Sequence, residues 1–518
     1  MHATIYSATT LGVDAYSVHI EVDLSFGMIQ FFIVGLPDRA INESRQRIDT
    51  ALKNSGIRLP ERRITVNLAP ADLKKEGTLF DLPIAVGILQ ASGQLQIAKQ
   101  FLEETLFIGE LSLDGSIRPI KGTLAIACNA RSLGKKRIIL PESNVFEASL
   151  INDLEVIGVK NLIQLIGYLT NEIEIKPVIG GLHNNLLEKQ IFQKNNTIDA
   201  LDFNQVKGQQ QAKRALQICA AGRHNILFIG SPGSGKTMLA KRLPTIMPPM
   251  SFDEIIETSK IYSVNGKLLN NRLITQRPFR NPHHTISQPG LVGGGSLPQP
   301  GEISLTHNGI LFLDELTEFK RCTLEVLRQP LENKNVTISR ANHALIFPAN
   351  FLLVAALNPC PCGYFGDKKK SCSCNAHHIK RYLEKLSGPL LDRIDLQINI
   401  QPIEYSDIHQ AQANQSSAQL YQAVQKATLL QQKRFGSSSF FNANMSSDLI
   451  DKFCTVSGEA QEALQKAFER LHLSMRGYHK ILKVARTIAD LEEQESIQLP
   501  HVLEAISYRS LDQAREKM

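Results

Sequence analysis

The sequence has no tryptophan, few aromatic residues and no long uninterrupted apolar run. Only 6% of its 518 residues are aromatic. No segment reaches the roughly 18 to 20 apolar residues that a membrane-spanning helix needs, and residues 1–7 lack the basic, then apolar start of a secretory signal. A composition of 43% hydrophobic and 21% charged residues excludes collagen-like, mucin-like and wholly disordered chains. We therefore expect a cytoplasmic protein without a membrane partner.

The chain also has only a small excess of positive over negative charge. Lys and Arg number 57 against 50 Asp and Glu, a formal charge of +7. This balance permits contact with a polyanion without requiring it. At about 150 residues per domain, the length corresponds to roughly three to four domains. Motifs must therefore indicate the partner and the activity.

Hydrophobic patterning divides the chain into four segments. Residues 1–170 combine short alternating strands with helical stretches at 40–55 and 82–95, which predicts an α/β or α+β domain. Residues 171–199 are polar and rich in Asn, as in a linker. Residues 200–402 have α/β patterning, and helical periodicity takes over in residues 403–518.

A phosphate-binding motif follows an apolar segment near the middle of the chain. Residues 226–229 predict a strand, and the pattern G-x-x-x-x-G-K-[ST] comes next, before a helix. In this motif backbone N–H groups wrap the phosphates, the lysine reaches the β and γ oxygens, and the hydroxyl ligates Mg²⁺. The predicted ATP-binding residues are Gly230, Ser231, Pro232, Gly233, Ser234, Gly235, Lys236 and Thr237.

Two further apolar strands end in polar side chains. Residues 310–313 lead to Asp314, which we expect to hold Mg²⁺, and to Glu315, which we expect to polarise the attacking water. Residues 352–357 lead to Asn358, a candidate for orienting the same water. Without the upstream P-loop, Asp314 and Glu315 would be interpreted as an ordinary strand end, and Asn358 as a turn residue after a strand.

Two arginines are candidates for the γ-phosphate. Arg393 lies at the end of the α/β segment, and Arg476 lies where a helix of the last segment begins. A guanidinium from either residue stabilises the charge of a transferring phosphoryl group, and Arg393 would do so from a neighbouring subunit. The alternative for each is a surface ion pair.

Half of the eight cysteines crowd into one short segment: Cys360, Cys362, Cys372 and Cys374. In a reducing compartment, such a cluster indicates a metal rather than disulfides. Tetrahedral Zn²⁺ takes four thiolates in a closed structural site, although C-x-C is a tighter spacing than the common C-x-x-C. The alternative is a loop of reduced cysteines.

Basic loops are candidate DNA contacts. Lys368, Lys369 and Lys370 lie between the two cysteine pairs beside two aromatic residues. Residues 336–346 predict a β-hairpin with Arg340 near its tip. A lysine run is usually just solvated, and a hairpin arginine often pairs with a neighbouring carboxylate.

Two other features lie between the P-loop and Asp314. The glycine-rich residues 288–296 are expected to form neither a helix nor a strand interior. The adjacent His283 and His284 would alternate faces on a strand. We expect them to hydrogen-bond backbone or phosphate rather than a metal.

Several motifs together resemble the ComM/YifB group of magnesium-chelatase-like AAA+ ATPases, from near residue 1 to about residue 509. They are the P-loop and residues 202–209, 280–287, 358–363, 390–395 and 484–490. The resemblance implies an α/β AAA+ core with a C-terminal helical lid, assembled as a hexameric ring. It makes Asn358 sensor 1, Arg393 a finger acting in trans and Arg476 sensor 2. It also places residues 288–296 where related motors insert a pore loop.

The N-terminal segment resembles the Lon-type proteolytic domain, a fold shared with ribosomal protein S5. Residues 66–77 and 109–122 carry this similarity. Leu79 stands where Lon has its nucleophilic serine, and residues 123–126 lack the partner lysine. A Ser-Lys dyad needs both groups. We therefore expect a non-proteolytic domain that serves ring assembly or DNA contact.

By family, the resemblance implies an ATP- and Mg²⁺-dependent DNA helicase. Such a motor drives branch migration of recombination intermediates when transforming DNA integrates, with other recombination proteins as possible partners. Two alternatives remain. One is the motor subunit of a magnesium chelatase, which lacks the front domain, and the other is an ATP-driven protein remodelling factor.

Overall fold

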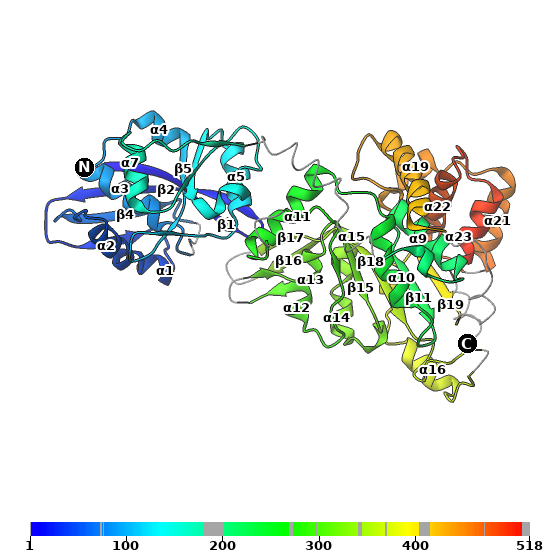
Figure 1. The fold of residues 1–518 in the computed structure, drawn as a ribbon. Coiled ribbons are helices and arrows are strands. Elements are labelled where there is room, and N and C mark those ends of the chain that lie inside the picture. Colours follow the sequence, from blue (N-terminus) through cyan, green and yellow to red (C-terminus); the bar gives the residue numbers. More distant parts are fainter. Residues whose placement is uncertain are drawn as a thin grey trace. The chain divides into compact units, whose positions relative to one another are not determined.

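The computed structural model describes residues 2–72, 75, 77–180, 201–268, 273–295, 298–339, 344–367, 370–402, 415–470 and 472–509 (Figure 1). The chain forms two compact units, Met1–Phe192 with Ile256–Ile274, and Gln193–Ile255 with Thr275–Met518. Among the helices in the described ranges, none has both the length and the apolar content that crossing a bilayer requires.

Two sheets and a small hairpin form the strands of the first unit. Alternating side chains along the longer strands are buried, as expected for sheets with one covered face. One sheet has the order β1-β2-β4-β3, with β3 parallel to β4, and the other has the order β10-β9-β8-β5. The strands are β1 (His2–Leu11), β2 (Asp14–Ser25), β3 (Phe31–Val34), β4 (Arg63–Ala69), β5 (Thr105–Phe107), β6 (Glu110–Leu111), β7 (Ile117–Arg118), β8 (Arg137–Pro141), β9 (Glu155–Val159) and β10 (Val178–Ile179).

Helices of the first unit pack on these sheets. The nearly fully buried α3 lies against β1 and β2 and ends at Gly93 in the left-handed region. The single helix expected at 40–55 is interrupted at Glu43. The Asp38 carboxylate caps the start of the first piece by accepting from the Ile41 N–H. The helices are α1 (Arg39–Asn42), α2 (Ser44–Asn54), α3 (Asp81–Ser92), α4 (Lys99–Glu104), α5 (Thr123–Ser132), α6 (Val145–Ala148) and α7 (Leu162–Leu169).

Residues 256–274 belong to the first unit although the P-loop lies upstream of them. They include most of α11 (Phe252–Val264). The Ser263 hydroxyl donates a hydrogen bond to the buried carboxylate of Glu147, and the Ser263 carbonyl accepts one from the Gly122 N–H. Burial raises the pKa of Glu147. These contacts explain why the segment packs with residues more than 100 positions earlier.

A parallel sheet with the order β12-β15-β18-β11-β19 forms the centre of the second unit. Its inner strands are apolar throughout because both faces are covered. We call the end where the strands start the amino edge and the end where they finish the carboxyl edge. The strands are β11 (Ile226–Gly230), β12 (Phe279–Arg280), β15 (Ile310–Leu313), β18 (Leu352–Leu357) and β19 (Leu396–Ile400).

Short ribbons and helices surround this sheet. The expected hairpin is confirmed as β16 (Asn335–Ser339) and β17 (Ala344–Pro348). The expectation for residues 288–296 was wrong in part. Ser287 caps α12, Pro289 fits its first turn, and β13 (Gly293–Gly294) pairs with β14 (Gln299–Pro300). The helices are α9 (Gln210–Gly222), α10 (Lys236–Arg242), α12 (Gln288–Val292), α13 (Glu302–Leu305), α14 (Arg321–Glu325), α15 (Arg328–Asn333), α16 (Ala376–Leu383) and α17 (Gly388–Leu391).

Helices alone form the regular structure of the described C-terminal residues, and they gather beside α9 (Figure 1). They are α19 (Ser417–Phe435), α20 (Ser447–Phe453), α21 (Gly458–Arg470), α22 (Met475–Leu491) and α23 (Leu499–Ser507). One apolar core runs from the parallel sheet into these helices. The predicted α/β class with a helical C-terminal part is confirmed.

A largely buried carboxylate links the sheet to these helices. Asp395, just before β19, accepts a hydrogen bond of 3.0 Å from the Asn225 N–H and lies 3.0 Å from the Lys480 ammonium of α22. Burial raises the pKa of Asp395, but Lys480 and the neighbouring His224 outweigh burial and hold that pKa below its usual range. The ionised form of Asp395 therefore stabilises the fold.

Asp395→Asn should lower the free energy of unfolding by about 3 kcal/mol at neutral pH, because it leaves the buried Lys480 without its counter-charge. An Asp pKa below its unfolded value adds stability that is complete above about pH 4 and is lost as the pH falls further. Urea unfolding at pH 7 and at about pH 3 checks both effects. The exposed Asp392→Asn is the control, and equal stability of the two variants at pH 7 would contradict the prediction.

Candidate nucleotide site and cysteine cluster

The P-loop joins the carboxyl edge of β11 to α10. Gly233 and Gly235 have φ values of 80° and 93°, which favour glycine. A Cβ on Gly230 would lie 2.5 Å from the Ile400 carbonyl oxygen of β19, so no larger residue fits there. The loop therefore has the glycine positions and the strand-to-helix setting of a phosphate cradle.

Lys236 folds back over this loop. Its Nζ donates to the carbonyl oxygens of Gly230 at 2.7 Å and Ser231 at 3.0 Å, and to Asn358 Oδ1 at 3.2 Å. Burial lowers the pKa of Lys236, while the nearby Asp314 and Glu315 oppose that shift. The ammonium and the Asn358 side chain thus meet at the carboxyl edge, as predicted for neighbouring parallel strands.

A hydroxyl and a carboxylate meet beside the lysine. The Thr237 hydroxyl donates to Asp314 Oδ2 at 2.7 Å, and Asp314 Oδ1 accepts from the Glu315 N–H at 3.0 Å. Oxygen ligands of this kind suit Mg²⁺. Glu315 has a left-handed backbone with a φ of 51°, and its side chain is half exposed. The Glu315 carboxylate is therefore accessible to solvent just beyond the end of β15.

A histidine lies next to Glu315. His284 Nδ1 is 3.4 Å from Glu315 Oε2, and its ring lies 4.1 Å from that of His283, centre to centre. The expectation that these histidines alternate faces of a strand was wrong, because His284 lies in a turn beyond β12. No sequence pattern predicted that His284 approaches Glu315.

Both predicted arginines lie at the amino edge, remote from the P-loop of the same chain. Asn225, which precedes β11, donates through Nδ2 to the Arg393 carbonyl oxygen at 3.0 Å. Arg393 Nη2 is 2.5 Å from Glu332 Oε1, and Arg476 Nη2 is 3.6 Å from the same oxygen. The structure thus brings Arg393 and Arg476 together, but apart from Lys236 and Asp314.

A cavity of about 290 Å³ opens at these arginines. Glu332, Arg393, Arg476, Lys334 and Lys483 are among its lining residues. Burial, with smaller contributions from neighbouring cations, lowers the pKa of Lys334 to about 8. The cavity wall is therefore rich in cationic groups, as a site for an anion requires. No sequence motif pointed to Glu332 or Lys334.

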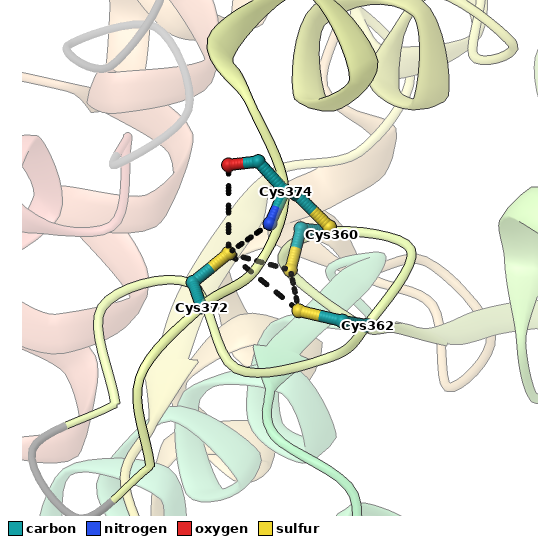
Figure 2. Close-up of side chains that lie close together, drawn as sticks. All are labelled: Cys360, Cys362, Cys372 and Cys374. Carbon is teal, nitrogen blue, oxygen red and sulfur yellow. Dashed lines mark hydrogen bonds between the residues drawn. The ribbon is translucent and has the colours of Figure 1, made fainter.

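The four clustered cysteines converge on one point (Figure 2). Their sulfur atoms all lie within 4.8 Å of one another. The Sγ of Cys362 is 3.3 Å from that of Cys360 and 3.5 Å from that of Cys372. Zinc–thiolate bonds of about 2.3 Å in a tetrahedron put sulfurs about 3.8 Å apart. The donor set and its spacing therefore fit Zn²⁺.

The DNA-contact candidates are only partly within the described structure. Arg340, Lys368 and Lys369 lie outside the described residues. Lys370 is exposed, and its Nζ lies 4.9 Å from the centre of the Tyr364 ring. This arrangement is a cation–π contact at the surface of the loop that the cysteines hold.

Leu79, which the resemblance to Lon puts at the position of the nucleophile, has an apolar environment. The Leu79 side chain packs against the core of the first unit, and the Leu79 carbonyl accepts from the Gly109 N–H at 2.9 Å. The neighbouring Thr78 hydroxyl donates to the Glu110 carboxylate. Leu79 therefore has a packing role in this unit.

Comparison with known proteins gives matches along most of the chain. Residues 202–408 match the family described as "Magnesium chelatase, subunit ChlI", and residues 414–509 match its C-terminal family. Residues 20–144 match the family described as "Subunit ChlI of Mg-chelatase". These families imply ATP and Mg²⁺ as the ligands of the P-loop.

Individual relatives are similar over the full length. The chain is 43% identical to "Competence protein ComM" of Haemophilus influenzae over 517 residues, 100% of this chain and 99% of the relative. It is 41% identical to "Uncharacterized protein YifB" of Salmonella typhimurium, covering 98% and 97% of the two chains. "Lon protease 2" of Bacillus subtilis is 25% identical over 149 residues, 27% of each chain. The expected Lon-like domain and AAA+ core are confirmed, and the chain belongs to the ComM/YifB group of magnesium-chelatase-like AAA+ proteins.

Proposed function

We propose that this protein is an ATP-driven DNA translocase that assembles as a hexameric ring and moves branched recombination intermediates. One observation carries the proposal. Each subunit has a complete phosphate cradle at the carboxyl edge and a pair of arginines at the amino edge of the same sheet. A ring is the simplest arrangement that brings each cradle to the arginines of a neighbour.

Hydrolysis in this proposal uses side chains that already lie together. Lys236 binds the β and γ oxygens of ATP, and Thr237 with Asp314 would hold Mg²⁺, which neutralises phosphate charge when bound. Glu315 accepts a proton from the attacking water, and Asn358 orients that water. His284 lies close enough to fix the Glu315 side chain before ATP binds.

The position of Arg393 supports action in trans. β19 runs parallel to β11, with Leu396 beside Ile226 and Ile400 beside Gly230. A strand of this length places the amino edge about 13 to 17 Å from the P-loop. An arginine side chain is too short to cross that distance, so Arg393 serves a nucleotide held by another subunit.

Two findings support DNA as the substrate that this protein binds and moves. The relative from Haemophilus influenzae is named a competence protein. Lys370 stacks on Tyr364, and such cation and ring pairs suit the phosphates and bases of single strands. The remaining proposed contacts are Arg340, Lys368 and Lys369.

We also propose that Cys360, Cys362, Cys372 and Cys374 hold a structural Zn²⁺ that fixes this basic loop. Bound zinc would contribute folding free energy to the loop rather than chemistry. Their sulfur positions already resemble a tetrahedral set.

Cys372→Ser should release the metal and weaken DNA binding about tenfold, because a site of three thiolates binds Zn²⁺ poorly and the loop loses its anchor. Metal analysis of the purified protein and a DNA-binding titration check both effects. Cys322→Ser is the control, since Cys322 is an exposed cysteine outside the cluster. Unchanged zinc content in Cys372→Ser would contradict the assignment.

ATP hydrolysis should be measured with no DNA, single-stranded DNA, duplex and a four-way junction, with strand exchange followed in the same tubes. Lys236→Ala is the control for contaminating ATPases. Junction-stimulated turnover with strand exchange is the expected result. The chelatase-like family match favours one other candidate, the motor of a metal chelatase, and ATPase activity indifferent to every DNA would support that function instead.

A further inference from the structure

One carboxylate holds both arginines that the proposed reaction needs. Glu332 comes from α15, Arg393 follows α17, and Arg476 opens α22, so three separate elements meet at Glu332 Oε1. The Arg393 side chain is only 10% exposed, whereas Glu332 is 44% exposed. Arg393 is therefore the enclosed member of this set, whereas the Glu332 carboxylate and Arg476, which is 66% exposed, are accessible to solvent.

Arg393 has a buried hydrogen-bond donor without an acceptor among the described residues. Its Nη1 donates to the Pro389 carbonyl oxygen and its Nη2 pairs with Glu332. Its Nε is buried and has no acceptor among the described residues. A buried N–H without a partner is costly, so this arginine is arranged for an acceptor with more oxygens than one carboxylate.

The cavity beside Glu332 suits such an acceptor. Lys334 and Lys483 line it together with Arg393 and Arg476. A terminal phosphoryl group has three oxygens and more negative charge than a carboxylate, and arginine binds it in the same forked geometry. The carboxylate of Glu332 thus resembles a weaker version of the ligand that these cations favour.

We propose that Glu332 is a stand-in for the γ-phosphoryl group of ATP and makes ring closure selective for ATP over ADP. In a subunit without a nucleotide-bearing neighbour, Glu332 holds Arg393 and Arg476 together. The neighbour's ATP displaces the carboxylate, whereas ADP has no γ-phosphoryl group to do so. Glu332 is a positioning residue, and this inference rests on the proposed ring.

The test is nucleotide-dependent assembly of Glu332→Gln, measured by light scattering in a Glu315→Gln background that retains its ATP. Glutamine keeps the shape but removes the competing charge. We expect the ATP concentration for half-assembly to fall about fivefold, and assembly to begin with ADP. The control is Glu325→Gln, which removes a similar ion pair, that of Glu325 with Arg328 at 2.8 Å, and should change neither value.

Two further variants protect the test. If Glu332→Gln unfolds at a lower temperature than the parent, Glu332→Asp replaces it. A carboxylate one methylene shorter cannot reach both arginines, so Glu332→Asp should also favour assembly. In an Arg393→Ala, Arg476→Ala background, Glu332→Gln should have no effect on assembly. A shift that persists in that background would overturn the inference.

The parent protein, with Glu315→Gln alone, tests the proposed ring separately from the role of Glu332. Assembly of the parent with ATP, together with an unchanged midpoint in Glu332→Gln, overturns the role of Glu332 and leaves the ring intact. Failure of the parent to assemble at any ATP concentration overturns the ring and this inference together.

Discussion

Glu315→Gln should bind ATP normally while hydrolysing it at least about 100-fold more slowly. Glutamine has nearly the same shape as glutamate, but its amide cannot accept a proton from the attacking water. Lys236 keeps its contacts with the loop, and Asp314 keeps its hydrogen bond from Thr237. The loss should therefore fall on the chemical step rather than on nucleotide affinity.

Single-turnover hydrolysis and binding of a fluorescent ATP analogue separate these effects for Glu315→Gln. Glu318→Gln is the matched control, because Glu318 is an exposed acid on the same short turn. Lys236→Ala should instead lose binding as well as turnover. Wild-type turnover in Glu315→Gln would remove Glu315 from its proposed role.

Much of the nucleotide site could be predicted from the sequence because its residues follow strand ends. The P-loop, Asp314 and Asn358 each come directly after a short apolar strand. In a parallel sheet these strand ends share one edge, so local patterns alone place the side chains close together. The contacts of Lys236 with Asn358 and of Thr237 with Asp314 agree with that reasoning.

Glu332, which pairs with the two predicted arginines at the amino edge, gave no comparable signal. Glu332 is one of 50 acidic residues, and its approach to Arg476 depends on how the C-terminal helices pack against the sheet. His284 likewise meets Glu315 through a turn rather than through strand alternation. The packing of residues 256–274 with the first unit could not be predicted either, because the Ser263 hydroxyl contacts the Glu147 carboxylate, which is distant in the sequence.

The division of the site between two edges has a mechanistic consequence. A subunit whose own arginines are out of reach should hydrolyse ATP slowly until a neighbour supplies them. In the proposed ring, each interface combines the cradle of one subunit with the arginines of the next, as in a closed heterologous assembly. The rate of ATP hydrolysis at an interface therefore depends on whether one subunit has an intact cradle and its neighbour has intact arginines. A subunit with one damaged side can still contribute its intact side to a neighbour.

Arg393→Ala should hydrolyse ATP about 1000-fold more slowly than wild type, because removal of an arginine finger takes away the charge that stabilises the transferring phosphoryl group. Lys236→Ala should be inactive for a different reason, since its own cradle is damaged. A mixture of the two should recover activity. At equal amounts, about a quarter of randomly formed interfaces join an intact cradle to an intact Arg393.

Steady-state ATPase measured across mixing ratios checks this prediction, with a maximum expected near equal amounts of the two proteins. Mixing Lys236→Ala with Glu315→Gln is the matched control. Both of those substitutions damage the cradle side, so no interface in that mixture is complete and no recovery should occur. If mixtures of Arg393→Ala and Lys236→Ala stay inactive at every ratio, although both proteins enter the same rings, Arg393 does not act across the interface.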